Sequence, residues 1–334
     1  MKRTAVIFIF CLITTLGVPT GMYALFVGRA AAPSETETAA KTDESGASET
    51  PSETDPYGDT ISVFMAETDR VEELDLLDYV VGVVAAEMPV SYAPEALKAQ
   101  AAVSLTLARY MQKSGAKADL GGAVISSDYR RHQAYLGEAA LRALWGERYD
   151  ENIAVIRAAV DAVSDVTITY AGEPILAVFH AISAGETESA ANVWGGDYPY
   201  LTRVDSSGDR LSAGFRSEET LPAAEFFQKL GLTPPEDPAA AVRNAVYSDA
   251  GYLRSVEICG TPFTGLSLRQ KLGLRSSAVS IDYADGDFIL SVRGYGHGVG
   301  MSQYGADYLA RQGYSWQEIV AHFYPGTEIR RGTL

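Results

Sequence analysis

Cysteine is nearly absent from this chain, which has two in 334 residues. Cys11 lies in an apolar N-terminal segment, and Cys259 has no second cysteine after that segment with which to pair. An intrachain disulfide is therefore excluded for the region from Tyr57 onward. Its 278 residues are enough to bury a core that needs no such crosslink.

Basic residues are also too few to balance the acidic ones, and the formal net charge is −16. Residues 57–334 contain 36 acidic and 23 basic side chains. Proteins that bind nucleic acid need basic surface to contact phosphates. The composition therefore predicts no nucleic-acid partner, whereas it is neutral with respect to sugars.

Charge is missing altogether from Ala5 to Val27, 23 positions that follow Lys2 and Arg3. As a helix this stretch would span roughly 34 Å, against about 30 Å of bilayer hydrocarbon. We predict an N-terminal transmembrane helix over residues 1–28, with everything after it outside the cytoplasm because the basic start stays inside. Ala30-Ala-Ala32 also fits a signal peptidase site, so cleavage is an open alternative.

Large apolar residues are rare from residue 29 to residue 56. Between Pro33 and Pro56 the chain consists mainly of Ser, Thr, Glu, Ala and Pro, with seven acidic residues and one lysine. Such a segment cannot bury a core. We predict a flexible acidic linker over 29–56 with a reach of roughly 27 Å, which would hold a globular domain at 57–334 off the membrane.

The remaining 57–334 region mixes helical and strand patterns. Apolar residues recur at helical spacing from Leu74 to Glu87, and Pro89 ends that pattern. Residues 166–170 and 175–179 alternate as in a hairpin around Gly172. Further helices are predicted at 94–113, 152–163, 223–230, 266–272, 302–312 and 315–322, and further strands at 61–65, 253–258, 279–283 and 288–293. The lack of a regular strand-helix alternation indicates an α+β fold of mixed helices and antiparallel hairpins.

One segment is unusually rich in glycine. Residues 293–306 read Arg-Gly-Tyr-Gly-His-Gly-Val-Gly-Met-Ser-Gln-Tyr-Gly-Ala, with five glycines in fourteen residues. Glycine admits close backbone approach. The donors and acceptors between the glycines suit a polar polymer such as a sugar chain; they are His297, Ser302, Gln303 and Tyr304. The alternative is a glycine-rich turn between a strand and a helix.

This glycine-rich motif, followed by His-Phe-Tyr-Pro-Gly-Thr at 322–327, resembles the closing signature of the stage II sporulation protein D (SpoIID) family. Three earlier segments resemble that family in the same order, at 79–89, 95–101 and 179–200. The resemblance implies a membrane-anchored lytic transglycosylase that cuts peptide-free peptidoglycan strands during forespore engulfment. It also implies a peptide-removing amidase and a membrane scaffold protein as partners. The competing interpretation is a non-catalytic glycan-binding module, as in the related amidase enhancers.

Glu87 is the candidate catalytic residue. It stands at the C-terminal end of an apolar helix, where the helix dipole gives a carboxylate no help and apolar neighbours favour its protonated form. A carboxyl group with a raised pKa can serve as a general acid. An isolated Glu at a helix end is more often a surface residue, but the resemblance places the catalytic acid of the family at this position.

The same resemblance assigns further residues to a glycan-binding groove. On the second helix Gln100 stands among small residues, which fits a side chain that faces the groove; a solvated glutamine is the open alternative. The central motif contributes His180, Ser183, Thr187, Glu188 and Trp194. A second carboxylate beside Glu87 would make the enzyme a hydrolase; the candidates are Asp78, Glu95, Glu188 and Asp197. A serine hydrolase is disfavoured because Ala181-Ile-Ser183-Ala-Gly185 lacks the first glycine of a nucleophile elbow.

Two of the chain's departures from the family pattern concern a metal site and an arginine. Some members hold zinc through cysteine and histidine after the second helix, but here that region contains no cysteine. Asp128 and His132 alone make a poor zinc site, so we predict no metal and no cofactor. The family often has an arginine where this chain has Leu105, and Arg109, one helical turn later, is a possible substitute.

Overall fold

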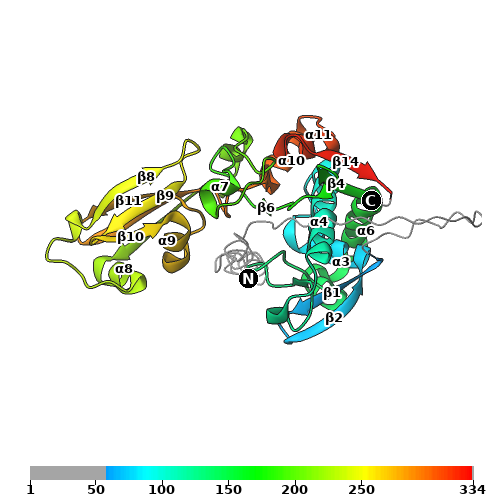
Figure 1. The fold of residues 1–334 in the computed structure, drawn as a ribbon, viewed down its shortest axis with the longest axis horizontal. Helices are drawn as coiled ribbons and strands as arrows, with labels where there is room; N and C mark the ends of the chain where they lie inside the picture. The colour runs from blue at the N-terminus through cyan, green and yellow to red at the C-terminus, as the bar shows by residue number, and fades with distance from the viewer. Residues whose placement is uncertain (1–57, 333–334) are drawn as a thin grey trace, which may run out of the picture.

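The computed structural model describes residues 58–332, which form two lobes with separate hydrophobic cores (Figure 1). The main lobe comprises residues 58–215 and 294–332, and the inserted lobe comprises residues 216–293. The inserted lobe leaves and re-enters the main lobe at one place, because the Gly294 N–H donates to the Phe215 carbonyl at 2.8 Å. Its first and last residues, Arg216 and Arg293, are cross-strand partners.

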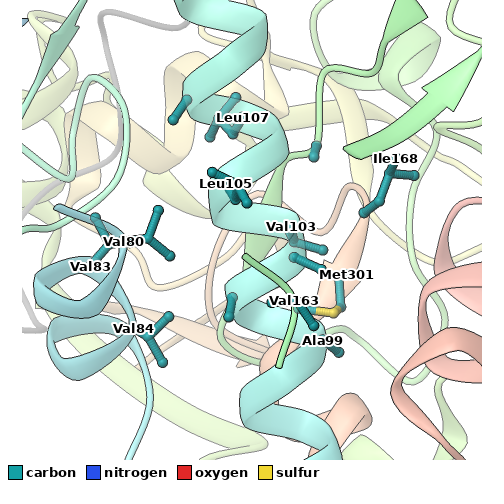
Figure 2. Close-up of a cluster of buried hydrophobic side chains, with 14 of the residues drawn as sticks. Val80, Val83, Val84, Ala99, Val103, Leu105, Leu107, Val163, Ile168 and Met301 are labelled. Atoms are coloured by element: carbon teal, nitrogen blue, oxygen red, sulfur yellow. The ribbon is translucent and has the colours of Figure 1, made fainter. Parts of the chain in front are cut away.

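Helix α4 (Pro94–Ser114) is the central element of the main lobe. Helices α3 (Leu76–Glu87) and α6 (Tyr149–Asp161) pack against it. Figure 2 shows the packing around α4, with Ala99, Val103, Leu105, Leu107, Val80, Val83, Val84, Val163, Ile168 and Met301 labelled. Because α4 is enclosed on nearly all sides, even its small polar positions lie inside the protein.

The ends of these helices follow from local sequence. The Asp75 carboxylate caps α3 by accepting from the N–H groups of Leu77 and Asp78, each at 2.9 Å. At the other end Met88 is extended, as expected for a residue before proline. Helix α4 begins at Pro94 and ends at Gly115, which has a φ of +78°. The predicted helix boundaries at Glu87 and Pro94 are confirmed.

Two small sheets cover the helices of the main lobe. Strand β1 (Thr60–Met65) pairs antiparallel with β2 (Arg70–Asp75) and parallel with β3 (Ile125–Ser126). Strand β4 (Val166–Tyr170) lies between β5 (Glu173–Pro174) and the C-terminal β14 (Glu328–Arg331). Neither β2 nor β14 was predicted, because five of the six β2 residues are exposed and β14 is mostly polar.

The predicted hairpin between 166–170 and 175–179 is wrong over most of its second strand. Glu173 and Pro174 pair with β4, and the Ile175 N–H donates to the Ile168 carbonyl at 3.1 Å, but the pairing goes no further. Residues 175–178 are all apolar and nearly fully buried, so they cross the core without the two-residue alternation of a surface hairpin. Strand β6 (Phe179–His180) then pairs parallel with β13 (Met301–Ser302). This pairing joins the central motif to the glycine-rich motif.

The inserted lobe has two three-stranded antiparallel sheets, in the orders β11-β12-β7 and β10-β9-β8. The strands are β7 (Arg216–Pro222), β8 (Val242–Tyr247), β9 (Leu253–Ile258), β10 (Thr261–Thr264), β11 (Ala278–Ala284) and β12 (Asp287–Arg293). Helices α8 (Ala223–Leu230) and α9 (Gly265–Leu272) close its core. Both helices confirm the sequence prediction, whereas β7, β8 and β10 were not predicted.

Four shorter helices complete the main lobe: α5 (Glu138–Trp145), α7 (Ala190–Val193), α10 (Gln303–Arg311) and α11 (Trp316–Phe323). The α+β class with antiparallel hairpins is confirmed. Among residues 58–332 no helix combines the length and hydrophobicity needed to span a bilayer. The predicted anchor at 1–28 and linker at 29–56 lie outside the described residues.

Candidate functional site

Glu87 lies at the end of α3 with both carboxyl oxygens hydrogen-bonded to neutral donors. The Ala134 N–H donates to Oε1 at 2.7 Å, and the Gln303 side-chain amide donates to Oε2 at 3.2 Å. The side chain is part-buried. Burial raises the pKa of Glu87 above its ordinary value, and the two hydrogen bonds oppose this shift. Among residues 58–332 no ion pair involves Glu87, so the site favours a protonated carboxyl group.

A loop that contains Ala134 reaches Glu87 because Gly82 lets it lie against α3. A Cβ atom at position 82 would stand 2.4 Å from the Tyr135 ring and 2.7 Å from the Leu136 carbonyl. The loop is held further by the Leu136 N–H, which donates to the Gly82 carbonyl at 3.3 Å. Tyr135 also stacks on the buried Tyr79, with centroids 5.5 Å apart. The contact at Glu87 therefore depends on a small residue more than one turn earlier.

Gly82→Ala is expected to destabilise the protein by about 1–2 kcal/mol, because overpacking at Tyr135 exceeds the gain in helix propensity. The substitution also pushes the loop away from Glu87, so we expect a loss of function larger than the loss of folded protein. Thermal unfolding and glycan cleavage measured on the same preparation check both effects.

Gly137→Ala is the matched control, since a Cβ there would meet nothing closer than 3.7 Å. Its φ of −72° suits any residue. Equal stability of the two variants would contradict the proposed role of Gly82.

Gln303 begins α10 and brings the glycine-rich motif to Glu87. The preceding Ser302 caps this helix by accepting from the Gly305 N–H at 3.1 Å. Gln303 itself is buried, with 6% of its surface exposed, while Tyr304 is half-buried. Gln303 and Glu87, 216 residues apart, are therefore joined by a direct side-chain hydrogen bond.

Asp209, which sequence reasoning missed, holds the two motifs together. It accepts hydrogen bonds from the Ser183 N–H at 2.7 Å, the Ser302 hydroxyl at 2.9 Å and the Ser206 hydroxyl at 3.0 Å. Asp209 is fully buried, and burial raises its pKa. Ser183 and Ser302 are fully enclosed as well, so their contacts in this structure position the loops. A lone Asp in a polar loop gives no sequence signal for such a role.

A cluster of rings lies beside this junction. The His180 and His297 rings are 5.6 Å apart between centroids, and Trp194 meets His297 edge-on at 5.3 Å. Burial lowers the pKa of His180 to about 4 and that of His297 well below its ordinary value. Both histidines are therefore neutral at physiological pH. The predicted residues His180, Trp194 and His297 thus come together, although from three different segments.

Thr187 and Glu188 are buried and engaged with the backbone. The Thr187 hydroxyl donates to the Thr202 carbonyl at 3.1 Å. Glu188 accepts through Oε1 from the Ser189 N–H at 2.7 Å and the Asn192 amide at 2.9 Å. Its other oxygen, Oε2, is buried without a partner. Glu188 thus has one oxygen without a hydrogen-bond partner in the protein. The Thr187 hydroxyl, by contrast, bonds the protein's own backbone.

Gln100 lies inside the core of the main lobe. Its side chain is fully buried, and its amide donates to Ser104 within α4 at 3.0 Å. Leu105 is fully buried too. The Arg109 guanidinium bonds the Val166 carbonyl at 3.0 Å and the Thr167 hydroxyl, so it fastens α4 to β4. Contact of Gln100 or Arg109 with a glycan stays a prediction. The hydrogen bonds that these side chains make within the protein account for their positions without a glycan.

The glycines of the motif approach the protein's own chain. At Gly300, with a φ of +70°, a Cβ would lie 2.0 Å from the Val178 carbonyl. At Gly296, with a φ of +121°, it would lie 2.6 Å from the His180 Cβ. These glycines are needed so that the motif can lie against the β6 segment. The expectation of close approach is right, and the neighbour is the central motif.

The other candidate carboxylates are not bonded to Glu87. Asp78 pairs with Arg157 at 2.8 Å, and Glu95 pairs with Lys98 at 2.7 Å. The carboxylate of Glu95 also accepts from the Trp316 N–H at 2.8 Å, and its pKa is lowered. Asp197 is exposed. A second acid acting with Glu87 therefore has no support in the hydrogen-bond geometry.

His132, the residue weighed as a zinc ligand, accepts a hydrogen bond through Nδ1 from the Ser126 N–H at 3.2 Å. Burial lowers the pKa of His132 to about 4. Within residues 58–332 no three His, Cys, Asp or Glu side chains gather in a way that could hold a metal ion. That the protein needs no metal or cofactor stays a prediction.

Comparison with known proteins agrees with the arrangement of motifs. A family model described as Stage II sporulation protein matches residues 65–170, which include Glu87. Stage II sporulation protein D of Bacillus subtilis is 36% identical over 81% of this chain and 78% of its own length. The chain belongs to the stage II sporulation protein D family. Its counterpart in Bacillus amyloliquefaciens is likewise 36% identical, over 81% of this chain.

A more distant similarity links this family member to another kind of protein. The amidase enhancer of Bacillus subtilis is 25% identical over 74% of this chain, but only 40% of the enhancer is matched. Membership of the SpoIID family makes the protein a sporulation protein. The family name does not specify a reaction, and the enhancer shows that related sequences occur in proteins with other names.

Proposed function

We propose that this SpoIID protein is a lytic transglycosylase that cleaves peptide-free peptidoglycan strands during forespore engulfment. The observation that carries the proposal is the state of Glu87. Burial raises its pKa, it belongs to no ion pair of the described residues, and both oxygens are oriented by neutral donors. These are the properties of a carboxyl group that can donate a proton near neutral pH.

Gln303 suits a group that must act in both protonation states. As a carboxylate, Glu87 accepts from the Gln303 amide N–H at 3.2 Å. As an acid, Glu87 could donate to the amide oxygen if the same side chain rotates, because a Gln amide has both donors and an acceptor. The Ala134 N–H meanwhile keeps Oε1 oriented. The site thus supports a residue that first gives a proton and then takes one.

The proposed reaction needs only this one carboxyl group. Glu87 gives its proton to the bridging glycosidic oxygen, and the bond from that oxygen to C1 of N-acetylmuramic acid breaks. The C6 hydroxyl of the same sugar then forms a bond to C1, and the Glu87 carboxylate takes the hydroxyl proton. Because the nucleophile belongs to the substrate, its effective concentration is high and no activated water is required.

End-group analysis tests this function. The full chain is incubated with peptide-free glycan strands, and the new ends are identified by mass spectrometry. We expect 1,6-anhydromuramic ends. Reducing ends would identify a hydrolase with a second carboxylate. Binding without any cleavage would favour the alternative, a glycan-holding module related in function to the amidase enhancer.

The membrane and protein partners are part of the same proposal. We propose that the segment 1–28 anchors the protein in the cell membrane with its catalytic region outside the cytoplasm. There it would act beside a peptide-removing amidase and a membrane scaffold protein. Purification from engulfing cells that recovers neither partner would count against this arrangement.

A further inference from the structure

The two lobes meet at a seam that contains several buried polar atoms without a partner. We define the seam as residues 269–275 of the inserted lobe together with residues 180–188 and 294–298 of the main lobe. Its two sides are joined by the Gly296 N–H, which donates to the Arg275 carbonyl at 2.9 Å. The glycine-rich motif and the inserted lobe, on the left in Figure 1, therefore share this boundary.

Arg269 of α9 is the most unusual group in the seam. Only 4% of its surface is exposed. Its Nε donates to the Leu274 carbonyl at 3.2 Å, but its Nη1 is buried without a partner. None of the ion pairs among residues 58–332 includes it. A buried cation without a counter-ion is costly, because the protein does not replace the hydration that the charge loses.

Arg275 adds a second cation to the seam. Its guanidinium lies over the Tyr295 ring at 4.3 Å from the centroid, and its Nε is buried without a partner. Arg275 is half-buried as a whole, so it is the part of the seam that solvent reaches. It too is absent from the ion pairs of the described residues.

The main-lobe side of the seam does not neutralise both cations. His180 has a buried Nε2 without a partner, and it is neutral because burial lowers its pKa to about 4. The seam contains two carboxylates. Glu186 is paired with Arg203 at 2.8 Å, so only Glu188, whose N–H donates to the Gly298 carbonyl at 2.7 Å, supplies a negative charge that is outside the ion pairs of the described residues. Two arginines against one carboxylate leave a net positive charge in a protein whose overall charge is −16. Such a site suits a small anion.

We propose that the seam binds a carboxylate through Arg269 and Arg275, and that its ligand in the cell is the lactyl carboxylate of muramic acid. The second half of this inference rests on the proposed function. Arginine binds carboxylates through paired N–H donors, which explains why two guanidinium groups keep unused donors here.

This ligand would let the protein distinguish stripped strands from peptide-bearing ones. The lactyl group of muramic acid is a free carboxylate only after its peptide has been removed, and otherwise it is a neutral amide. An arginine that binds the carboxylate gains much less from the amide, since the charge-assisted part of the hydrogen bond is lost. The inserted lobe would therefore contribute to substrate choice.

The first test needs no glycan. Thermal unfolding of the full chain is measured with sodium lactate and with lactamide, its neutral counterpart. We expect lactate to raise the midpoint by roughly 2 °C and lactamide to leave it unchanged. Arg275→Gln should abolish the lactate effect, and Arg254→Gln, an exposed arginine of the same lobe, should retain it. A parent protein that responds equally to both compounds would mean that the seam holds water only, and would overturn the inference.

The second test uses peptide-free strands and the same strands with their lactyl carboxylates converted to methylamides. We expect the parent to bind the free strands about tenfold more tightly or better, and Arg275→Gln to lose this preference. If the parent binds both kinds of strand with equal affinity and cleaves both, the seam proposal fails while the proposed function stands. If lactate binds at Arg275 but no strand is bound or cleaved, the proposed function fails and the anion site stands, without its assigned ligand.

Discussion

Glu87→Gln is expected to reduce the rate of glycan cleavage by about a hundredfold to ten-thousandfold, the usual contribution of a general acid. Glutamine has nearly the same shape and keeps an oxygen that can accept from the Ala134 N–H at this position. It cannot give a proton to the glycosidic oxygen. We therefore expect 1,6-anhydromuramic ends to form more slowly, while the affinity of the protein for the strand stays nearly unchanged.

The pH dependence of the parent provides a second readout of Glu87. Cleavage requires the protonated acid, and burial raises the pKa of this group. The rate should therefore persist above the ordinary pKa of a glutamate and fall as pH rises through the raised value. The residual rate of Glu87→Gln should not show this fall as pH rises.

Glu95→Gln is a suitable control, because that carboxylate has a lowered pKa and its contact with the Trp316 N–H can be kept by an amide oxygen. We expect its cleavage rate to stay within a few-fold of the parent. If Glu87→Gln instead retained the parental rate, Glu87 would have no catalytic role and the glycan-holding alternative would be preferred.

Asp209→Ala is expected to lower the free energy of unfolding by about 3 kcal/mol. The substitution leaves the Ser183 N–H and the hydroxyls of Ser206 and Ser302 buried without their acceptor. Denaturant unfolding measures the loss. Asp209→Asn should lose less, since one acceptor oxygen remains. Asp249→Ala, which removes a carboxylate that is 93% exposed, should change stability by at most about 0.5 kcal/mol.

The same variant should also reduce activity through Gln303. Asp209 holds Ser302, which caps α10 immediately before Gln303, and Gln303 donates to Glu87. Cleavage by folded Asp209→Ala should therefore fall more than cleavage by folded Asp249→Ala. Equal rates per folded molecule would show that Asp209 acts on stability alone.

Local signals in the sequence placed Glu87 at a helix end, and the family resemblance marked it as the candidate acid. The apolar spacing of α3, its end at Met88 before proline and the placement of Glu87 at that end all follow from residues within a few positions of one another. The direction of the pKa shift of Glu87 could be predicted from its apolar neighbours for the same reason. The helices α8 and α9 were likewise predictable, because each has its own apolar periodicity and a terminal glycine.

Contacts between distant segments could not be predicted in this way. Gln100 was expected in a groove because its neighbours are small, yet α4 is enclosed by other elements and carries Gln100 into the core. The 175–178 segment was predicted as the second strand of a hairpin but crosses the core. Its hydrogen-bond partners include Tyr200, Met301 and Tyr324, which are distant in the sequence. Asp209 had no signal, because its three donors come from separate parts of the chain.

The sequence by itself therefore determined the family, the α+β class, most helix boundaries and Glu87 as the candidate acid, since these depend on motifs and on short-range periodicity. Only the tertiary structure decided that Gln303 and the Ala134 N–H orient Glu87, that Asp209 ties the motifs together, and that two arginines face the seam without a counter-ion. The physical reason is that burial and hydrogen-bond partnership belong to pairs of residues up to 216 positions apart. Such pairs form only when the packing of α4 and the inserted lobe brings their segments together.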